Sequence, residues 1–131
     1  PGGDALQAQL LAGGERVFER IARLAAGDWN RSGQLGLVVG ATYPREVERV
    51  RKLAPTLPLL IPGIGAQGGD AAATVRAGWR GDAQGTRAPI VVNSSRAVLY
   101  AGSGDDFAAA ARRAAMAARD ELQRARPHDS P

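Results

Sequence analysis

The stretch LLIPGIGAQGGD, residues 59–70, contains the pattern that decides the fold of this chain. It begins with a short, continuous apolar run, which is typical of a parallel-sheet strand covered on both faces. Small residues then turn the chain, and Asp70 is placed to cap a helix that we expect to run to about Ala77. A strand, a turn and a helix in this order make one βα unit.

Two further βα units flank this stretch. We expect strands at residues 35–39 and 89–92, because both are short apolar runs followed by turn residues. The helices that follow them are expected at residues 44–53 and, beginning with a capping box at Ser103 and Asp106, as far as about Arg126. Strands that alternate with helices predict a parallel sheet.

The rest of the chain is expected to add one helix and two irregular ends. Apolar residues recur at helical spacing from about Glu15 to Trp29, and we expect Trp29 to pack inward. Residues 1–14 are predicted to form a loop, and residues 127–131 a disordered tail. We therefore treat residues 1–131 as one segment.

Three strands cannot close a (β/α)8 barrel, which needs about 250 residues. The pattern alone leaves two α/β architectures open. One is a small open sheet of three parallel strands. The other is the C-terminal part of a TIM (β/α)8 barrel, comprising about three βα units. The chain does not begin with Met, and we expect it to be part of a longer gene product.

Composition excludes several classes of protein. The chain has no cysteine and one histidine, His128, which rules out disulfide scaffolds and metal centres rich in Cys or His. No apolar run approaches the roughly 18 residues of a membrane span, and no signal-like segment opens the chain, so a cytoplasmic location is expected. The net charge is +4, but the basic residues are interleaved with acids and aromatics are only 5%. We therefore expect no nucleic-acid partner.

Two neighbouring loops carry the candidate binding residues. After the second strand, Pro62, Gly63 and Gly65 begin a glycine-rich turn whose backbone N–H groups are free to converge on an anion. After the third strand, the Ser-Ser-Arg segment of residues 94–96 follows at the corresponding level, and a guanidinium suits phosphate oxygens. The pattern favours a phosphate site. The alternative is that the glycines only permit tight turns and that Arg96 pairs with a surface acid.

These motifs resemble one enzyme family. Residues 59–70 are similar to the seventh strand and following loop of orotidine 5′-monophosphate decarboxylase, in the second of its sequence subfamilies, common in bacteria. Residues 38–42 (VVGAT) resemble its sixth strand, and residues 92–97 (VNSSRA) its eighth. The opening residues 1–3 resemble those that follow its fifth strand. The resemblance covers nearly the whole chain, in the family's order.

The resemblance implies a cofactor-free decarboxylation of orotidine monophosphate to uridine monophosphate, the last step of pyrimidine biosynthesis, by an intact protein that is a homodimer. In that family, the residues matching Gln67 and Arg96 hold the 5′-phosphate, and Gln67 also reaches toward the pyrimidine. The backbone N–H matching that of Ser95 contributes. We expect the substrate-binding residues to be Pro62, Gly63, Gly65, Gln67, Ser95 and Arg96.

The family's catalytic array is missing from this chain. That array is an Asp-x-Lys pattern followed closely by another Asp, whereas the only lysine here is Lys52, on a helix face without an aspartate near it. We therefore expect no catalytic residue, an inactive chain, and a partner in the missing N-terminal half of the barrel. The isolated chain is expected to expose the apolar interior of its sheet and to associate.

Two other functions remain open at this point. The first is a non-catalytic phosphate- or nucleotide-binding module derived from the same barrel. The second is a phosphate-binding barrel of different chemistry, such as a decarboxylase of sugar acids or a biosynthetic isomerase. The context of Gln67 and the NSSRA segment argue against the latter.

Overall fold

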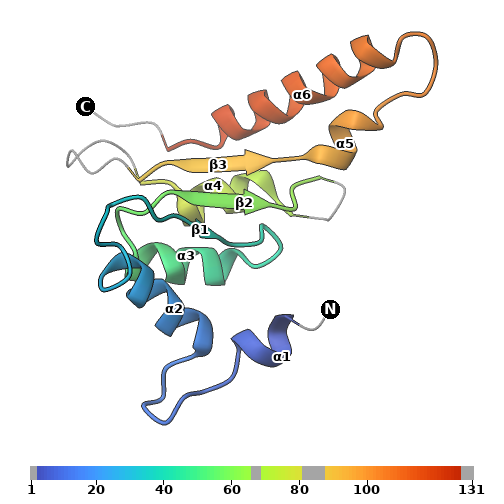
Figure 1. Cartoon of the computed structure of the whole chain (residues 1–131). Helices are drawn as coiled ribbons and strands as arrows, with labels where there is room; N and C mark the ends of the chain where they lie inside the picture. Colours follow the sequence, from blue (N-terminus) through green and yellow to red (C-terminus); the bar gives the residue numbers. More distant parts are fainter. Residues whose placement is uncertain (1–2, 66–68, 81–87, 128–131) are drawn as a thin grey trace.

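The computed structural model describes residues 3–65, 69–80 and 88–127 and contains three strands with helices between and around them (Figure 1). In chain order the elements are α1 (Gly3–Gln7), α2 (Val17–Ala26), β1 (Leu37–Val38), α3 (Pro44–Leu53), β2 (Leu59–Pro62), α4 (Ala71–Gly78), β3 (Ile90–Asn93), α5 (Ser95–Leu99) and α6 (Phe107–Arg124).

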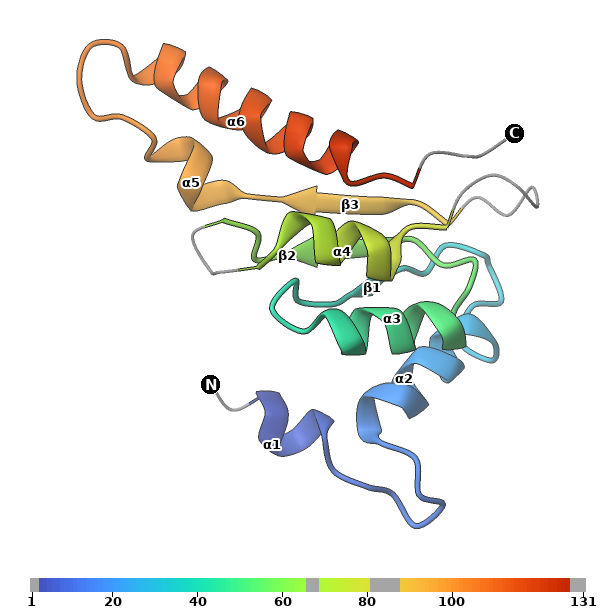
Figure 2. The same cartoon turned by 180° about the vertical axis from the view of Figure 1, so that it is seen from behind.

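The three strands form a parallel sheet in the order β1-β2-β3. Leu59 of β2 pairs with Leu37 of β1 on one side and with Ile90 of β3 on the other. The strands lie in front in Figure 1, and α3 and α4 lie in front of them in the reverse view of Figure 2. The predicted parallel βα units are confirmed.

The core lies on the helix-covered face of the sheet. Leu59 and Ile61 have no exposed surface, and they form one apolar cluster with residues that include Val47 of α3 and Ala71 of α4. On the opposite face, Val38 and Val91 are 68% and 57% exposed. The expectation that the strands are covered on both faces is therefore wrong for this chain.

One-sided coverage distinguishes between the two architectures that the sequence left open. An open doubly wound sheet carries helices on both faces, whereas a (β/α)8 barrel carries them only on the outside. The chain has the second arrangement, so its fold is α/β with three βα units of a barrel. The exposed face is the one that lies inside a closed barrel, as expected for a part of it.

Arg51 holds together the end of the sheet where the strands begin. Its side chain is fully buried on α3. It donates to the backbone carbonyls of Leu57 at 2.7 Å, Gly78 at 2.8 Å and Ala88 at 3.3 Å, and to two others in the segment after α3. Burial, and to a smaller extent the charge of Arg80, lowers the pKa of the Arg51 guanidinium to about 10. This arginine is therefore a structural group that joins three connections.

The N-terminal part differs from its prediction. Residues 1–14 are not all loop, since α1 occupies Gly3–Gln7, and the Tyr43 hydroxyl donates to Asp4 of this helix at 2.9 Å. The sequence shows no apolar stripe there because α1 has no buried residue and depends on a distant side chain. The helix expected to reach Trp29 ends at Ala26, before Gly27, a poor helix former. Trp29 is therefore exposed, not packed inward.

The C-terminal part also differs. A short helix, α5, follows β3 directly, and α6 begins at Phe107 without the capping box expected at Ser103 and Asp106. Asp106 precedes α6, but its side chain makes no capping bond and instead binds Arg113 at 3.0 Å. α6 ends at Arg124, close to the predicted Arg126. Most of the predicted tail, residues 128–131, lies outside the described residues.

Within the described ranges, none of the helices is both long and apolar enough to span a membrane.

Candidate functional site

The loops that follow β2 and β3 begin side by side. The last residues of the two strands, Pro62 and Asn93, are partners in the sheet register. Because the strands are parallel, both chains leave the sheet at the same edge, and the glycine-rich loop starts next to the Ser-Ser-Arg segment. The sequence predicted that these two loops leave the sheet at the same level, and the register of β2 and β3 confirms this.

A small hollow of about 70 Å³ lies between these loops. It brings together four of the six predicted binding residues, Pro62, Gly63, Ser95 and Arg96. Gly65 is outside the hollow but lies against the second loop, because a Cβ built on it would be 3.5 Å from the Ser94 hydroxyl. Gln67 lies outside the described residues.

Glycine is required at several points of the first loop. Gly63 and Gly65 have φ angles of 104° and 77°, a region that residues with a side chain rarely adopt. At the far end of the loop, the Gly69 N–H donates to the Gly63 carbonyl at 3.0 Å. A Cβ on Gly69 would lie 2.6 Å from that carbonyl oxygen and 2.7 Å from Cβ of Ala41. The base of the loop is therefore closed by a backbone contact that only glycine allows.

Ser94 connects the two loops. Its hydroxyl donates to the Ile64 carbonyl at 3.2 Å. This bond holds the start of α5 against the glycine-rich turn and sets the position of Ser95 and Arg96, the next two residues. The sequence places Ser94 in this loop but not among the predicted binding residues. The pair of adjacent serines directly after a strand is the signal that could have singled it out.

Arg96 is exposed in the first turn of α5. Among the described residues it takes part in none of the ion pairs, which all join other side chains. The described part of the chain therefore does not support the alternative that Arg96 serves to neutralise a surface acid. Arg96 is one of the residues that line the hollow, and a guanidinium carries donors that suit an anion.

Arg96 is the one charged residue among the described residues that line the hollow. In the described part of its lining there is no carboxylate, lysine, histidine or cysteine. Lys52 lies elsewhere, on α3, where its Nζ is 2.6 Å from the Glu48 carboxylate and 58% of its side chain is exposed. The hydrogen bond from Lys52, together with the charge of that side chain, lowers the pKa of Glu48 below its ordinary value. The prediction that Lys52 lies on a solvated helix face is confirmed, and its lack of a catalytic role stays a prediction.

Tyr43 borders a different cavity, of about 280 Å³, between α1, α2 and β1. The hydrogen bond that its hydroxyl donates to Asp4, together with the charge of that carboxylate, raises the pKa of Tyr43. Tyr43 does not line the hollow beside Arg96. Among the described residues, no group of three His, Cys, Asp or Glu is placed to hold a metal ion.

The sequence is similar to curated bacterial proteins over nearly its whole length. It is 67% identical to orotidine 5′-phosphate decarboxylase of Variovorax paradoxus over 130 residues, which are 97% of this chain and 46% of that protein. It is 70% identical to the protein of the same name from Polaromonas naphthalenivorans, covering 96% of this chain and 44% of the relative. The chain thus spans about half the length of the curated relatives it matches. No family model matches it.

Solved structures show the same relationship. UMP synthase of Leishmania donovani matches with a TM-score of 0.73 and 38% identity, over 92% of this chain and 25% of that one. OMP decarboxylase of Leishmania donovani matches with a TM-score of 0.70 and 34% identity, over 93% of this chain and 44% of that one. The chain is therefore homologous to part of the orotidine 5′-phosphate decarboxylases and has the fold of the corresponding barrel segment.

Proposed function

We propose that this chain is the C-terminal, phosphate-binding part of an orotidine 5′-phosphate decarboxylase, an enzyme that converts orotidine monophosphate to uridine monophosphate and carbon dioxide in pyrimidine biosynthesis. The observation that carries the proposal is the hollow in which Gly63, Ser95 and Arg96 come together. The names of relatives that are 65–70% identical to the chain support the identity of the reaction.

The proposed role of this part is to bind the 5′-phosphate of the nucleotide. Arg96 supplies a fixed positive charge, and backbone N–H groups of the glycine-rich loop and of Ser95 supply further donors. Phosphate lies far from the pyrimidine carbon that loses carbon dioxide. Binding energy gained there organises the site where the reaction takes place. We propose Gln67 as a further phosphate and pyrimidine contact from the same loop.

The reactive groups are proposed to come from the N-terminal half of the barrel. The described residues around the hollow include no acid, base or lysine, so this part does not protonate the ring carbon. The open face of the sheet, with Val38, Leu60 and Val91 exposed, supports a partner that covers it. The strands of the missing half would place their own apolar side chains against these residues.

Complementation tests this proposal. The chain is mixed with the N-terminal segment of the Variovorax paradoxus relative, and the absorbance of orotidine monophosphate is followed. We expect turnover only in the mixture, and a large loss of activity on Arg96→Ala, because the phosphate loses its charged partner. Lys52→Ala is the matched control and leaves turnover unchanged, since Lys52 is exposed and paired with Glu48. A folded complex of the two parts that shows no turnover contradicts the proposal.

A second candidate function is nucleotide binding without chemistry. One observation favours it: Ser95 and Arg96 come together with the start of the glycine-rich loop around one hollow. It predicts that uridine monophosphate binds to the chain alone and that Arg96→Ala abolishes the binding. Titration calorimetry tests this, with Arg112→Ala, on the exposed side of α6, as the control.

For the intact protein we propose a cytoplasmic homodimer, in line with the family resemblance. Analytical ultracentrifugation of the complemented barrel tests the oligomeric state, and a stable monomer at assay concentrations would contradict it.

A further inference from the structure

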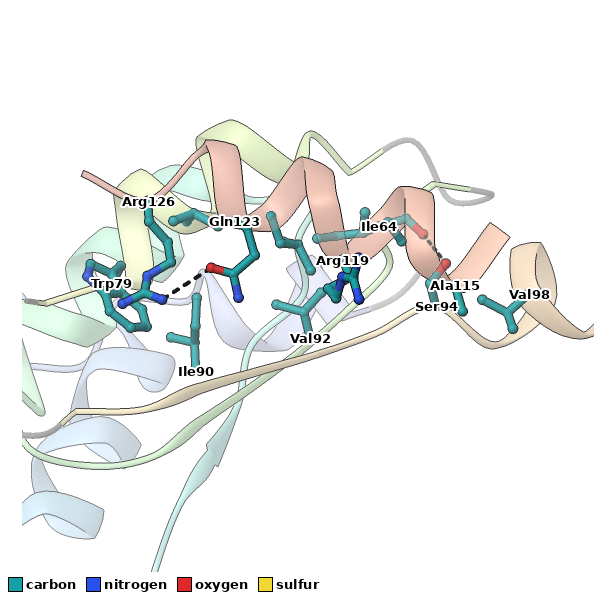
Figure 3. A pocket seen from close by; sticks show the side chains of 13 residues that line it. Ile64, Trp79, Ile90, Val92, Ser94, Val98, Ala115, Arg119, Gln123 and Arg126 are labelled. Atoms are coloured by element: carbon teal, nitrogen blue, oxygen red, sulfur yellow. Dashed lines mark hydrogen bonds between the residues drawn. The ribbon is translucent and has the colours of Figure 1, made fainter. Parts of the chain in front are cut away.

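A cavity of about 390 Å³ lies between α6 and the helix-facing side of β3 (Figure 3). Cavities that hold small molecules are usually of roughly 300–1,000 Å³. In Figure 3 the side chains that line it lie in a row beside β3, from Val98 at one end to Trp79 and Arg126 at the other. The cavity is therefore elongated. It shares Ile64 and Ser94 with the hollow at Arg96, and Trp79 and Arg126 line the opposite end.

The walls of this cavity are apolar. β3 contributes Ile90 and Val92, and α6 contributes Leu122 together with two small residues, Ala115 and Ala118. Alanine methyl groups do not reach across to β3, so a long space stays open beneath the helix. A ligand that fills this space needs an extended apolar body, because the walls offer few partners to polar groups along its length.

One end of the cavity is positively charged. The Arg126 guanidinium lies 4.3 Å from the centre of the Trp79 ring and donates to the Gln123 side-chain oxygen at 3.2 Å. The other arginine in the lining, Arg119, is bound by Asp120 at 2.6 Å. Among the described residues the lining contains no carboxylate. Arg126 therefore gives this end a positive charge, and Arg126 and the Gln123 amide together carry further N–H groups that can donate to a ligand.

We propose that this cavity binds the anion of a medium-chain fatty acid, with its carboxylate at Arg126 and Gln123 and its alkyl chain along β3 beneath α6. An apolar interior with one cationic end complements a carboxylate that carries an alkyl chain. A nucleotide would place its polar base and sugar against the apolar walls. The proposed carboxylate contacts, Arg126 and Gln123, do not line the hollow of the proposed phosphate site, and the proposal does not depend on the decarboxylase activity.

Tryptophan fluorescence of the whole chain tests the proposal. Of the two tryptophans, Trp29 is exposed, and Trp29→Phe leaves Trp79 in the cavity lining as the only one. Decanoate, added below its micellar concentration, is expected to change the Trp79 emission saturably. Arg126→Gln is expected to weaken binding by about tenfold or more, because it removes a charge-assisted hydrogen bond. Arg112→Gln, also on α6 but outside the lining, leaves binding unchanged.

A second variant and two competitors complete the test. Ala118→Leu fills the cavity and is expected to exclude decanoate, with the fold of each variant checked by circular dichroism. Decanol has the same chain without the charge and should bind more weakly. Saturating uridine monophosphate should not displace decanoate. The proposal is overturned if emission does not saturate, if decanol binds as tightly as decanoate, if Arg126→Gln behaves like Arg112→Gln, or if the nucleotide displaces the acid.

Discussion

The two faces of the sheet have similar side chains and very different surroundings. On the covered face, Leu59 and Ile61 of β2 are completely buried under α3 and α4. On the other face of the same strand, Leu60 is 39% exposed, and Val91 beside it is 57% exposed. The comparison shows that an apolar run predicts that its side chains are buried in a complete protein. The run does not say whether the residues that bury them belong to this chain.

The largest expected effect comes from the covered face. Ile61→Ala leaves a cavity in the core and should lower the free energy of unfolding by about 3–4 kcal/mol, as measured by urea denaturation. Leu60→Ala, on the same strand, should lower it by only about 1 kcal/mol or less, because its surroundings already include water. Equal losses for the two variants would show that the open face is covered in the isolated chain, by self-association or otherwise.

The next effect concerns Arg51, at the end of the sheet where the strands begin. Arg51→Leu removes the donor to several buried carbonyls, and leaving such groups unpaired costs about 1–3 kcal/mol. We expect the free energy of unfolding to fall by roughly 2–3 kcal/mol for this reason. Lys52→Leu, one position along and exposed, is the control and should change stability by less than about 0.5 kcal/mol. If Arg51→Leu left the free energy of unfolding unchanged, water would have to reach these carbonyls in place of the guanidinium.

The open face is tested through association. Val91→Glu places a charge where the complementary part would pack, so its binding to the N-terminal segment should weaken by about tenfold or more. The stability of the isolated chain should change little, since Val91 already meets solvent there. Sedimentation velocity measures the association, and thermal unfolding of the chain alone is the control. Unimpaired assembly would mean that Val91 faces away from the partner.

The smallest effect is expected at the surface between α2 and α3. Glu19 accepts hydrogen bonds from the Arg16 N–H at 2.8 Å and from Arg49 at 2.5 Å, and these bonds lower the pKa of Glu19. A carboxylate with a lowered pKa adds stability above its ordinary pKa, and this contribution is lost as the pH falls through the lowered value. Glu19→Gln should therefore cost about 1 kcal/mol or less near neutral pH and less still near pH 3. A cost that is independent of pH would contradict this assignment.

The sequence predicted the parallel βα units and the meeting of the two loops because these depend on local patterns. Apolar runs, Pro44 in the first turn of α3 and the Asp70 cap, whose carboxylate accepts from the Ala73 N–H at 2.9 Å, all act within a few residues. The elements that it missed depend on distant contacts. α1 is held by Tyr43, which is 39 residues away, and Arg51 finds its acceptors in segments up to 37 residues along the chain.

The site shows the same limit. The pairing of Pro62 with Asn93 follows from the parallel order, so the meeting of the two loops was predictable. The Ser94 bond to Ile64 was not, because it depends on the direction of one side chain after β3. Phe107 is a further example: it fits the apolar stripe of α6 but is 61% exposed, since the part of the helix on which it lies extends beyond the sheet (Figure 1).

The acceptors of Arg51 also set an order for biosynthesis. The ribosome releases Arg51 well before Gly78 and Ala88, the two distant carbonyls that this side chain binds. Until both have emerged, the Arg51 guanidinium hydrogen-bonds to water, because the protein does not yet offer these two acceptors. The contacts of Arg51 at this end of the sheet are therefore incomplete while only the first two βα units have been translated. These units become fully stable only after the third has been translated.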